Sequence, residues 1–191
     1  MTANLVVPVS AASVIVVVNS PLEVLMMRRP SGGMFGDAWV FPGGVLETSD
    51  GAVNGSDLSA FRLAASRELL EEAGVAVNPG EMVFVSRWVT PVELPRRYDT
   101  RFFLAVVASR PPLTLALGEV MEAAFVSPAT ALVAHQAQQW RMVLPTVSHL
   151  RWLSRFGTGA EAERAAAAAR PEPIQARLSE DGSVVEVEIP R

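Results

Sequence analysis

Residues 67–75 read Arg-Glu-Leu-Leu-Glu-Glu-Ala-Gly-Val, and this stretch decides the fold. A helix advances about 100° per residue, so Glu68, Glu71 and Glu72 lie within an arc of about 100° on one face. The apolar stripe beside that face consists of Leu58, Phe61, Ala65 and Leu69. We therefore predict a helix over residues 57–73 that carries three carboxylates at the edge of its buried face and ends at Gly74.

Three carboxylates this close repel one another, and a hard divalent cation such as Mg²⁺ or Mn²⁺ removes that cost because it prefers carboxylate oxygens. An isolated cluster of this kind is more often a solvated helix face. Two features favour a site here: residues 41–44, Phe-Pro-Gly-Gly, end a short strand before the helix, and Gly74-Val75 close the helix.

Together these segments resemble the Nudix box, G-x5-E-x7-R-E-U-x-E-E-x-G-U with U aliphatic. Gly44 matches the first glycine, and residues 67–75 match the second half throughout. The resemblance implies an α+β fold, a mixed-sheet α/β/α sandwich. It also implies a metal-dependent hydrolase that adds water across a phosphoanhydride bond in a nucleoside diphosphate linked to another group, X.

The resemblance also implies roles for individual residues. Glu68, Glu71 and Glu72 become ligands of Mg²⁺ or Mn²⁺, and one of them orients or deprotonates the attacking water. Arg67 becomes the residue that locks the glutamates in place. The glycine pair 43–44, Gly43 and Gly44, becomes the tight turn under the site, beside the substrate.

The middle of the box departs from the family pattern. Arg67 follows Gly44 by 23 positions, nine more than the 14 of the box. Counting forward from Gly44 places the first glutamate of the box at Asp50, and counting backward from Arg67 places it at Ser59. Glu47 and Asp50 are the candidates to replace that glutamate.

Flanking segments resemble a Nudix branch that includes the peroxisomal coenzyme A diphosphatases. The segments are residues 25–29, 41–46, 88–91, 96–103 and 145–146. This resemblance implies cleavage of coenzyme A or an acyl-CoA to 3′,5′-ADP and phosphopantetheine. Pro91, 16 positions after Val75, instead resembles the proline that ADP-ribose pyrophosphatases of the family carry there, which implies an ADP-ribose or nucleotide-sugar pyrophosphatase. A non-catalytic nucleotide-binding module is the third alternative, but such a module has no need of the intact glutamates.

Further candidates lie outside the box. Glu119 or Glu122 is a candidate fourth ligand or base, with a solvated loop acid as the alternative. Arg96, Arg97 and Arg101 are candidates to grip phosphate, since a guanidinium fork suits phosphate oxygens. The alternative for these arginines is an ordinary surface loop.

Aromatic and histidine residues receive more ordinary expectations. Trp88 or Tyr98 is a candidate to stack on an adenine, although core packing is the more common use of a tryptophan. His135 and His149 lie far from the box in sequence, so we expect both to be structural.

Composition excludes several classes of function. The net charge is −4 with no basic stripe, so we expect a small nucleotide rather than a nucleic-acid polymer as partner. All sixteen cationic residues are arginine, which excludes Schiff-base chemistry, and cysteine is absent, which excludes thiolate sites. The apolar run 13–18 is too short to span a membrane, so we expect a buried strand in a cytoplasmic protein.

The chain divides into a Nudix-like domain, residues 1–157, and a C-terminal extension, residues 158–191, that packs on it. The extension holds a weakly anchored alanine-rich helix, 160–169, and a hairpin around Asp181-Gly182; either is a candidate homodimer contact. Ser56 or Asp57 is placed to cap the box helix. Strands are expected at 13–18, 22–28, 39–41, 82–90, 100–108 and 120–126, and further helices at 128–138 and 144–156.

Overall fold

The computed structural model describes residues 6–32, 35–51, 57–170 and 173–175. The strands are β1 (Val9–Val18), β2 (Glu23–Arg28), β3 (Trp39–Val40), β4 (Gly43–Val45), β5 (Val83–Val89), β6 (Tyr98–Val107), β7 (Glu122–Val126) and β8 (Pro173–Gln175). The helices are α1 (Ser59–Ala73), α2 (Pro128–Gln136), α3 (Leu144–Leu153) and α4 (Gly159–Ala168), with short 3₁₀ turns η1 (Thr48–Asp50) and η2 (Pro79–Glu81).

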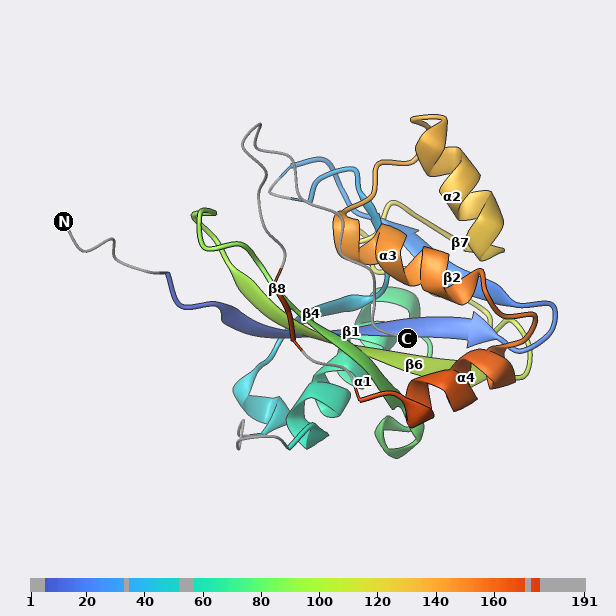
Figure 1. Cartoon of the computed structure of the whole chain (residues 1–191). Coiled ribbons are helices and arrows are strands. Elements are labelled where there is room, and N and C mark those ends of the chain that lie inside the picture. Colours follow the sequence, from blue (N-terminus) through green and yellow to red (C-terminus); the bar gives the residue numbers. More distant parts are fainter. Residues whose placement is uncertain (1–5, 33–34, 52–56, 171–172, 176–191) are drawn as a thin grey trace.

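The strands of the described residues form one mixed sheet in the order β3-β2-β1-β6-β5-β8, with β4 paired to β1 and β7 paired to β2 (Figure 1). Strand β1 is central: it runs parallel to β6 and antiparallel to β2 and β4. Strands that are distant in sequence are therefore neighbours, and the edge of β1 brings the glycine pair 43–44 onto the sheet.

Alternate residues of β1 enter two separate cores. Val14 and Val16 pack with Phe61 and Leu69 of α1 on one face of the sheet. Ile15 and Val17 pack on the other face, together with residues of α2, α3 and α4. A strand that is buried on both faces reads as a continuous apolar run. The predicted α+β class and mixed-sheet α/β/α sandwich are therefore confirmed.

Helix α4 corrects one expectation, because it is firmly anchored. Ala162 and Ala166 are buried in the same core as α3. Thr158 caps the helix start, where its side chain accepts from the backbone of Glu161. The backbone N–H of Ala160 donates to the Asn19 side chain at 2.9 Å. Alanine is small enough to let the helix lie close on the sheet, so its small side chains did not prevent firm packing.

Other boundaries also differ from the sequence predictions. Helix α1 begins at Ser59, two residues later than predicted, with Leu58 at the cap position and no side-chain cap. Ser56 lies outside the described residues, and Asp57 bonds Ser59 at the entrance to the helix. Most of the predicted hairpin also lies outside them; β8 pairs in parallel with β5. None of the described helices combines the length and apolarity that a membrane crossing requires.

Candidate active site

Helix α1 presents its three predicted carboxylates at three different depths. Glu72 is buried, with 5% of its surface exposed. The Glu68 side chain is partly buried at 14% exposure, and the Glu71 side chain is 55% exposed. The buried stripe of Phe61, Ala65 and Leu69 sets this gradient, because Glu72 lies one helical turn beyond the stripe and Glu71 faces solvent.

The glycine pair of β4 fits tightly against these carboxylates. The Gly43 N–H donates to Glu72 Oε2 at 2.9 Å. Gly43 has a φ of 155°, and a Cβ added there would lie 2.7 Å from the Cα of Ser13. A Cβ added at Gly44 would lie 2.7 Å from Glu68 Oε2. Gly43 therefore requires glycine because a Cβ would meet backbone, whereas a Cβ at Gly44 would displace the Glu68 carboxylate.

Arg67 ties the edge of the site together. Its guanidinium donates to both carboxylate oxygens of Asp50, at 3.0 and 2.9 Å. It also donates to Glu68 at 2.9 Å and to Glu71 at 3.0 Å. A bidentate arginine–carboxylate pair fixes geometry as well as charge. Arg67 thus contacts two of the three glutamates, Glu68 and Glu71, whereas Glu72 accepts from Gly43.

Asp50 occupies the position reached by counting forward from the glycine pair. It is buried, and it also accepts from the Glu47 backbone at 2.8 Å. Burial acts to raise the pKa of Asp50, but hydrogen bonds from Arg67 oppose this effect and hold that pKa below its ordinary value. The Glu47 side chain is 59% exposed and lies 4.0 Å from Arg67. Of the two candidates, Asp50 is therefore the main partner of Arg67.

The carboxylates of the site repel one another in a partly dry environment. Burial, opposed by the Gly43 hydrogen bond and reinforced by the charges of Glu68 and Glu119, raises the pKa of Glu72 to about 7. Burial likewise raises the pKa of Glu68, and the charges of Glu71 and Glu119 add to it. A positive charge placed between these oxygens would relieve the repulsion.

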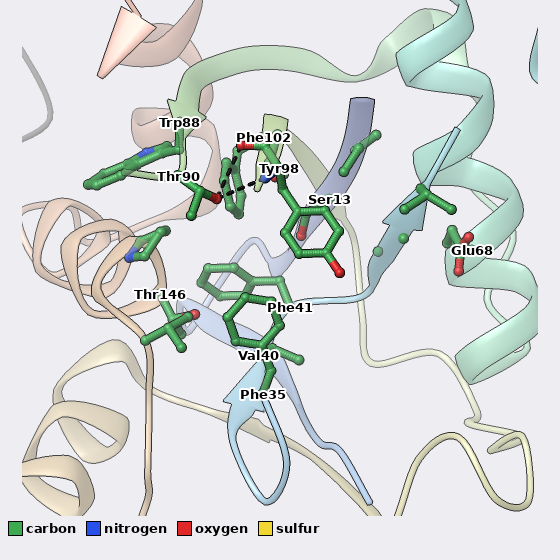
Figure 2. Close-up of a pocket in the computed structure, with 18 of the residues that line it drawn as sticks. Ser13, Phe35, Val40, Phe41, Glu68, Trp88, Thr90, Tyr98, Phe102 and Thr146 are labelled. Atoms are coloured by element: carbon green, nitrogen blue, oxygen red, sulfur yellow. Dashed lines mark hydrogen bonds between the residues drawn. The ribbon is translucent and has the colours of Figure 1, made fainter. Parts of the chain in front are cut away.

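A cavity of about 510 Å³ opens beside the carboxylates. Glu68, Glu72 and the exposed Glu119 line one end of it. Glu122, the alternative candidate, is instead paired with Arg28 at 2.7 Å. Figure 2 shows Glu68 at the edge of this space, with aromatic side chains from the other elements filling the view. The structure therefore brings Glu119, not Glu122, to the α1 glutamates.

The predicted phosphate-gripping arginines separate into two groups. Arg96 lines the cavity, exposed, with its guanidinium 5.3 Å from the centre of the Tyr98 ring. Arg97 is buried and donates to the backbone of Thr90 and Val6. Arg101 is buried over the Phe61 ring and pairs with Asp99 at 2.9 Å. Neither Arg97 nor Arg101 lines the cavity.

Arg29 is a cavity residue that the sequence analysis did not single out. It lines the cavity, and its charge acts to lower the pKa of Glu72. The only sequence signal was its place at the end of the 25–29 segment. Of the arginines in the described residues, Arg29 and Arg96 are therefore the two that face the cavity.

The far end of the cavity is aromatic. Phe41 and Phe102 contribute to its walls, with Trp88 and Tyr98, the two predicted stacking candidates (Figure 2). Trp88 is only 3% exposed, so it also belongs to the core. His135 bonds the Trp140 backbone, and His149 is fully buried beneath the aromatic wall; neither lines the cavity.

Comparison with known proteins agrees with this arrangement of helix, glycine turn and cavity. The NUDIX domain model matches residues 8–145. The chain belongs to the NUDIX domain family. It is 28% identical over 182 residues to "Putative nudix hydrolase 7" of Caenorhabditis elegans, with 76% of this chain and 60% of that protein covered. The chain thus spans about 60% of the length of this curated relative.

Solved NUDIX structures share the fold. The NUDIX hydrolase of Alicyclobacillus acidocaldarius superposes with a TM-score of 0.71 at 23% identity, covering 86% of this chain and 99% of that one. A bifunctional NMN adenylyltransferase/ADP ribose pyrophosphatase of Francisella tularensis, complexed with AMP and a manganese ion, gives 0.57 at 19% identity. It covers 80% of this chain and 43% of that one.

The NUDIX carboxylates of this chain fit a hard divalent cation by their chemistry. Glu68, Glu72 and Glu119 would offer oxygen ligands that repel one another, and Mg²⁺ and Mn²⁺ prefer such ligands. Within the described residues, no three His, Asp or Glu side chains are already grouped to hold a metal ion. Glu71 would have to leave its ion pair with Arg67 to join the other glutamates.

Proposed function

We propose that this NUDIX protein is a metal-dependent hydrolase of a phosphoanhydride bond in a nucleoside diphosphate linked to X. The observation that carries the proposal is Glu72, a buried carboxylate bonded to the Gly43 N–H at the end of a 510 Å³ cavity. A buried acid among like charges is costly in a purely structural role. Binding of a cation at this site would offset the free-energy cost of burying Glu72 among like charges.

The chain's own residues divide the work. Glu68, Glu72 and Glu119 would hold Mg²⁺ or Mn²⁺, which when bound polarises phosphoryl oxygens and lowers the pKa of water. Arg67 keeps Glu68 in place through its hydrogen bond, and Asp50 keeps Arg67 in place. Arg29, beside Glu72, is positioned to bind the diphosphate. The glycine pair lets backbone and phosphate approach closely.

For the X group we propose coenzyme A or an acyl-CoA first. Coenzyme A carries a 3′-phosphate, and Arg96 is the exposed cation at the cavity that suits a phosphate monoester. With Arg97 and Arg101 bound to other parts of the protein, Arg96 is the exposed arginine at the cavity, among the described residues, to which we assign this discrimination. ADP-ribose is the second candidate, because Pro91 lines the cavity and coenzyme A and ADP-ribose share the ADP portion.

The test is turnover of a substrate panel with Mg²⁺ or Mn²⁺, with products identified by mass. The panel holds coenzyme A, ADP-ribose, NADH, diadenosine polyphosphates and nucleoside triphosphates. We expect cleavage at the diphosphate and loss of turnover in excess EDTA. Turnover that persists in EDTA would overturn the metal-dependent mechanism. Tight nucleotide binding without turnover of any member would favour the non-catalytic binding module.

A further inference from the structure

His149 is a buried titratable group that the proposed chemistry does not use. It lies on α3, has no exposed surface, and is surrounded by residues of the cavity wall. Its ring centre is 4.4 Å from that of Phe102, 5.9 Å from that of Phe41 and 6.1 Å from that of Trp88. All three aromatic residues line the cavity, although His149 itself does not.

Hydrogen bonds link this histidine to two walls of the cavity. Its Nε2 lies 2.8 Å from the hydroxyl of Ser86, which is buried on β5. The indole N–H of Trp88 donates to the same hydroxyl oxygen at 3.1 Å. On the other side, His149 Nδ1 bonds the carbonyl oxygen of Pro145 at the start of α3. Trp88 and Pro145 are both cavity residues.

The chemistry of the end groups fixes the direction of the two outer bonds in this chain, and burial of the ring fixes the direction of the middle one. An indole N–H can only donate, so Ser86 Oγ accepts from Trp88 and has its own proton left for His149 Nε2. A carbonyl oxygen can only accept, so Nδ1 carries the imidazole proton and donates it to Pro145. Full burial disfavours a charged ring, so Nε2 is unprotonated and accepts from Ser86, and each of these polar atoms has a partner. Burial also lowers the pKa of His149 to about 3, in agreement with the neutral ring.

We propose that Ser86 and His149 are positioning residues that set the spacing between the β5 wall and the α3 wall, and thereby determine which ligand the aromatic end accepts. This inference rests on the proposed function, because it treats the cavity as the substrate site. The wall residues tied to His149 are uncharged: Phe41, Trp88, Phe102 and Pro145. The ligand portion placed there is an uncharged one, the nucleobase or an apolar part of X, while the diphosphate lies at the carboxylates.

The variant Ser86→Ala removes the acceptor of Trp88 and the donor to His149 without adding volume. The buried indole N–H of Trp88 then lacks an acceptor, which costs free energy unless the side chain moves. We therefore expect the β5 wall of the cavity to shift. We expect KM for the best substrate of the panel to rise about tenfold, equivalent to about 1.4 kcal/mol. We expect kcat at saturation to stay within about twofold, since the carboxylates are untouched.

Two controls separate positioning from simple loss of stability. Val147→Ala, on the same helix, weakens the core but leaves the hydrogen-bond chain intact; KM should then stay unchanged although Tm falls. Ring ¹⁵N shifts of His149 should show a protonated Nδ1 and an unprotonated Nε2 in the wild type and change in Ser86→Ala. An unchanged KM in Ser86→Ala, or an equal rise in Val147→Ala, would overturn the positioning role.

The proposal remains testable if no substrate is turned over. Affinity for AMP, measured by calorimetry, then replaces KM, and Ser86→Ala should weaken it about tenfold relative to Val147→Ala. In that case the hydrolase proposal fails while the positioning role survives. A wild-type protein that neither hydrolyses the panel nor binds AMP overturns both.

Discussion

The two ends of the cavity solve opposite electrostatic problems. At the carboxylate end, burial and neighbouring negative charges raise the pKa of Glu68 and of Glu72, and the hydrogen bond from Arg67 to Glu68 offsets only part of this. At the aromatic end, the chain from Trp88 through Ser86 and His149 is neutral and satisfied at each step. The difference supports the proposed division of function: a bound cation would offset the repulsion at the carboxylate end, whereas the hydrogen bonds at the aromatic end hold its walls in place.

We expect the largest effect on activity when the charge of the most buried acid, Glu72, is removed. Glu72→Gln keeps an oxygen for the Gly43 N–H but loses the negative charge, so we expect kcat to fall by about 10²–10⁴. Glu71→Gln is the matched control on the same helix, because that side chain is exposed and paired with Arg67. We expect a smaller loss there. Equal losses of kcat in the two variants with normal circular dichroism would show that the burial of Glu72 does not give it a larger role than Glu71.

The glycine turn offers the next largest effect. Gly44→Ala places a Cβ within 2.7 Å of Glu68 Oε2, so the carboxylate must move. A displacement of about 1 Å in an active site costs about 10²-fold in rate. Gly80→Ala is the control, since its Cβ would meet only Asn78 Oδ1 at 3.4 Å. Gly51 serves less well, because its φ of 101° strains any side chain. Full activity in Gly44→Ala would show that this approach is unnecessary.

The same comparison predicts opposite pH dependences of stability in metal-free protein. The pKa of Glu72 is raised from 4.5 to about 7, so the stability that protonated Glu72 contributes is fully present below pH 4.5 and is lost as the pH rises through 7. The pKa of His149 is lowered from 6.5 to about 3, so its contribution is present above pH 6.5 and lost as the pH falls toward 3.

Urea unfolding between pH 4 and 8, in EDTA, measures both slopes. The difference in unfolding free energy between wild type and Glu72→Gln should fall as the pH rises through this range. The difference between wild type and His149→Gln should rise instead, mainly below pH 6.5. Parallel curves for wild type and either variant would show that the group concerned is not perturbed by burial.

The sequence predicts an end of the cavity well when the residues of that end lie close together along the chain. Residues 67–73 lie in a single helix, α1, so the spacing of Glu68, Glu71 and Glu72 was sufficient to place them on one side of it. The continuous apolar run of β1, which is buried on both faces, was also visible, as was Gly74 at the end of α1. The carboxylate end is therefore mostly a property of one short segment and the glycine turn beside it.

The aromatic end joins elements that are distant in sequence, and no short pattern marks it. Ser86 and His149 are 63 positions apart, and their hydrogen bond depends on how α3 lies on the sheet. Arg97 and Arg101 looked equivalent to Arg96 in the sequence. In the structure both are buried: Arg97 bonds the protein backbone and Arg101 pairs with Asp99. Arg29 was missed for the same reason: only the tertiary fold brings it beside Glu72.

The smallest expected effect sharpens the choice between the two substrate candidates. Arg96 is exposed, lies over Tyr98 and lines the cavity, so its guanidinium can reach a phosphate group on the bound nucleotide. A hydrogen bond to a charged group is worth about 1.5–3 kcal/mol, and exposure reduces that, so we expect about a tenfold change. Arg96→Gln should lower kcat/KM for coenzyme A and leave dephospho-coenzyme A unchanged.

Arg97→Gln is the matched control for that measurement. It loses backbone hydrogen bonds to Thr90 and Val6, so Tm should fall while the ratio of kcat/KM values for coenzyme A and dephospho-coenzyme A stays constant. A ratio that is already near one in the wild type would mean that the 3′-phosphate is not recognised. If ADP-ribose then exceeds coenzyme A by tenfold or more in competition, the cation at this loop binds the diphosphate that both substrates share, and the ADP-ribose pyrophosphatase becomes the better assignment.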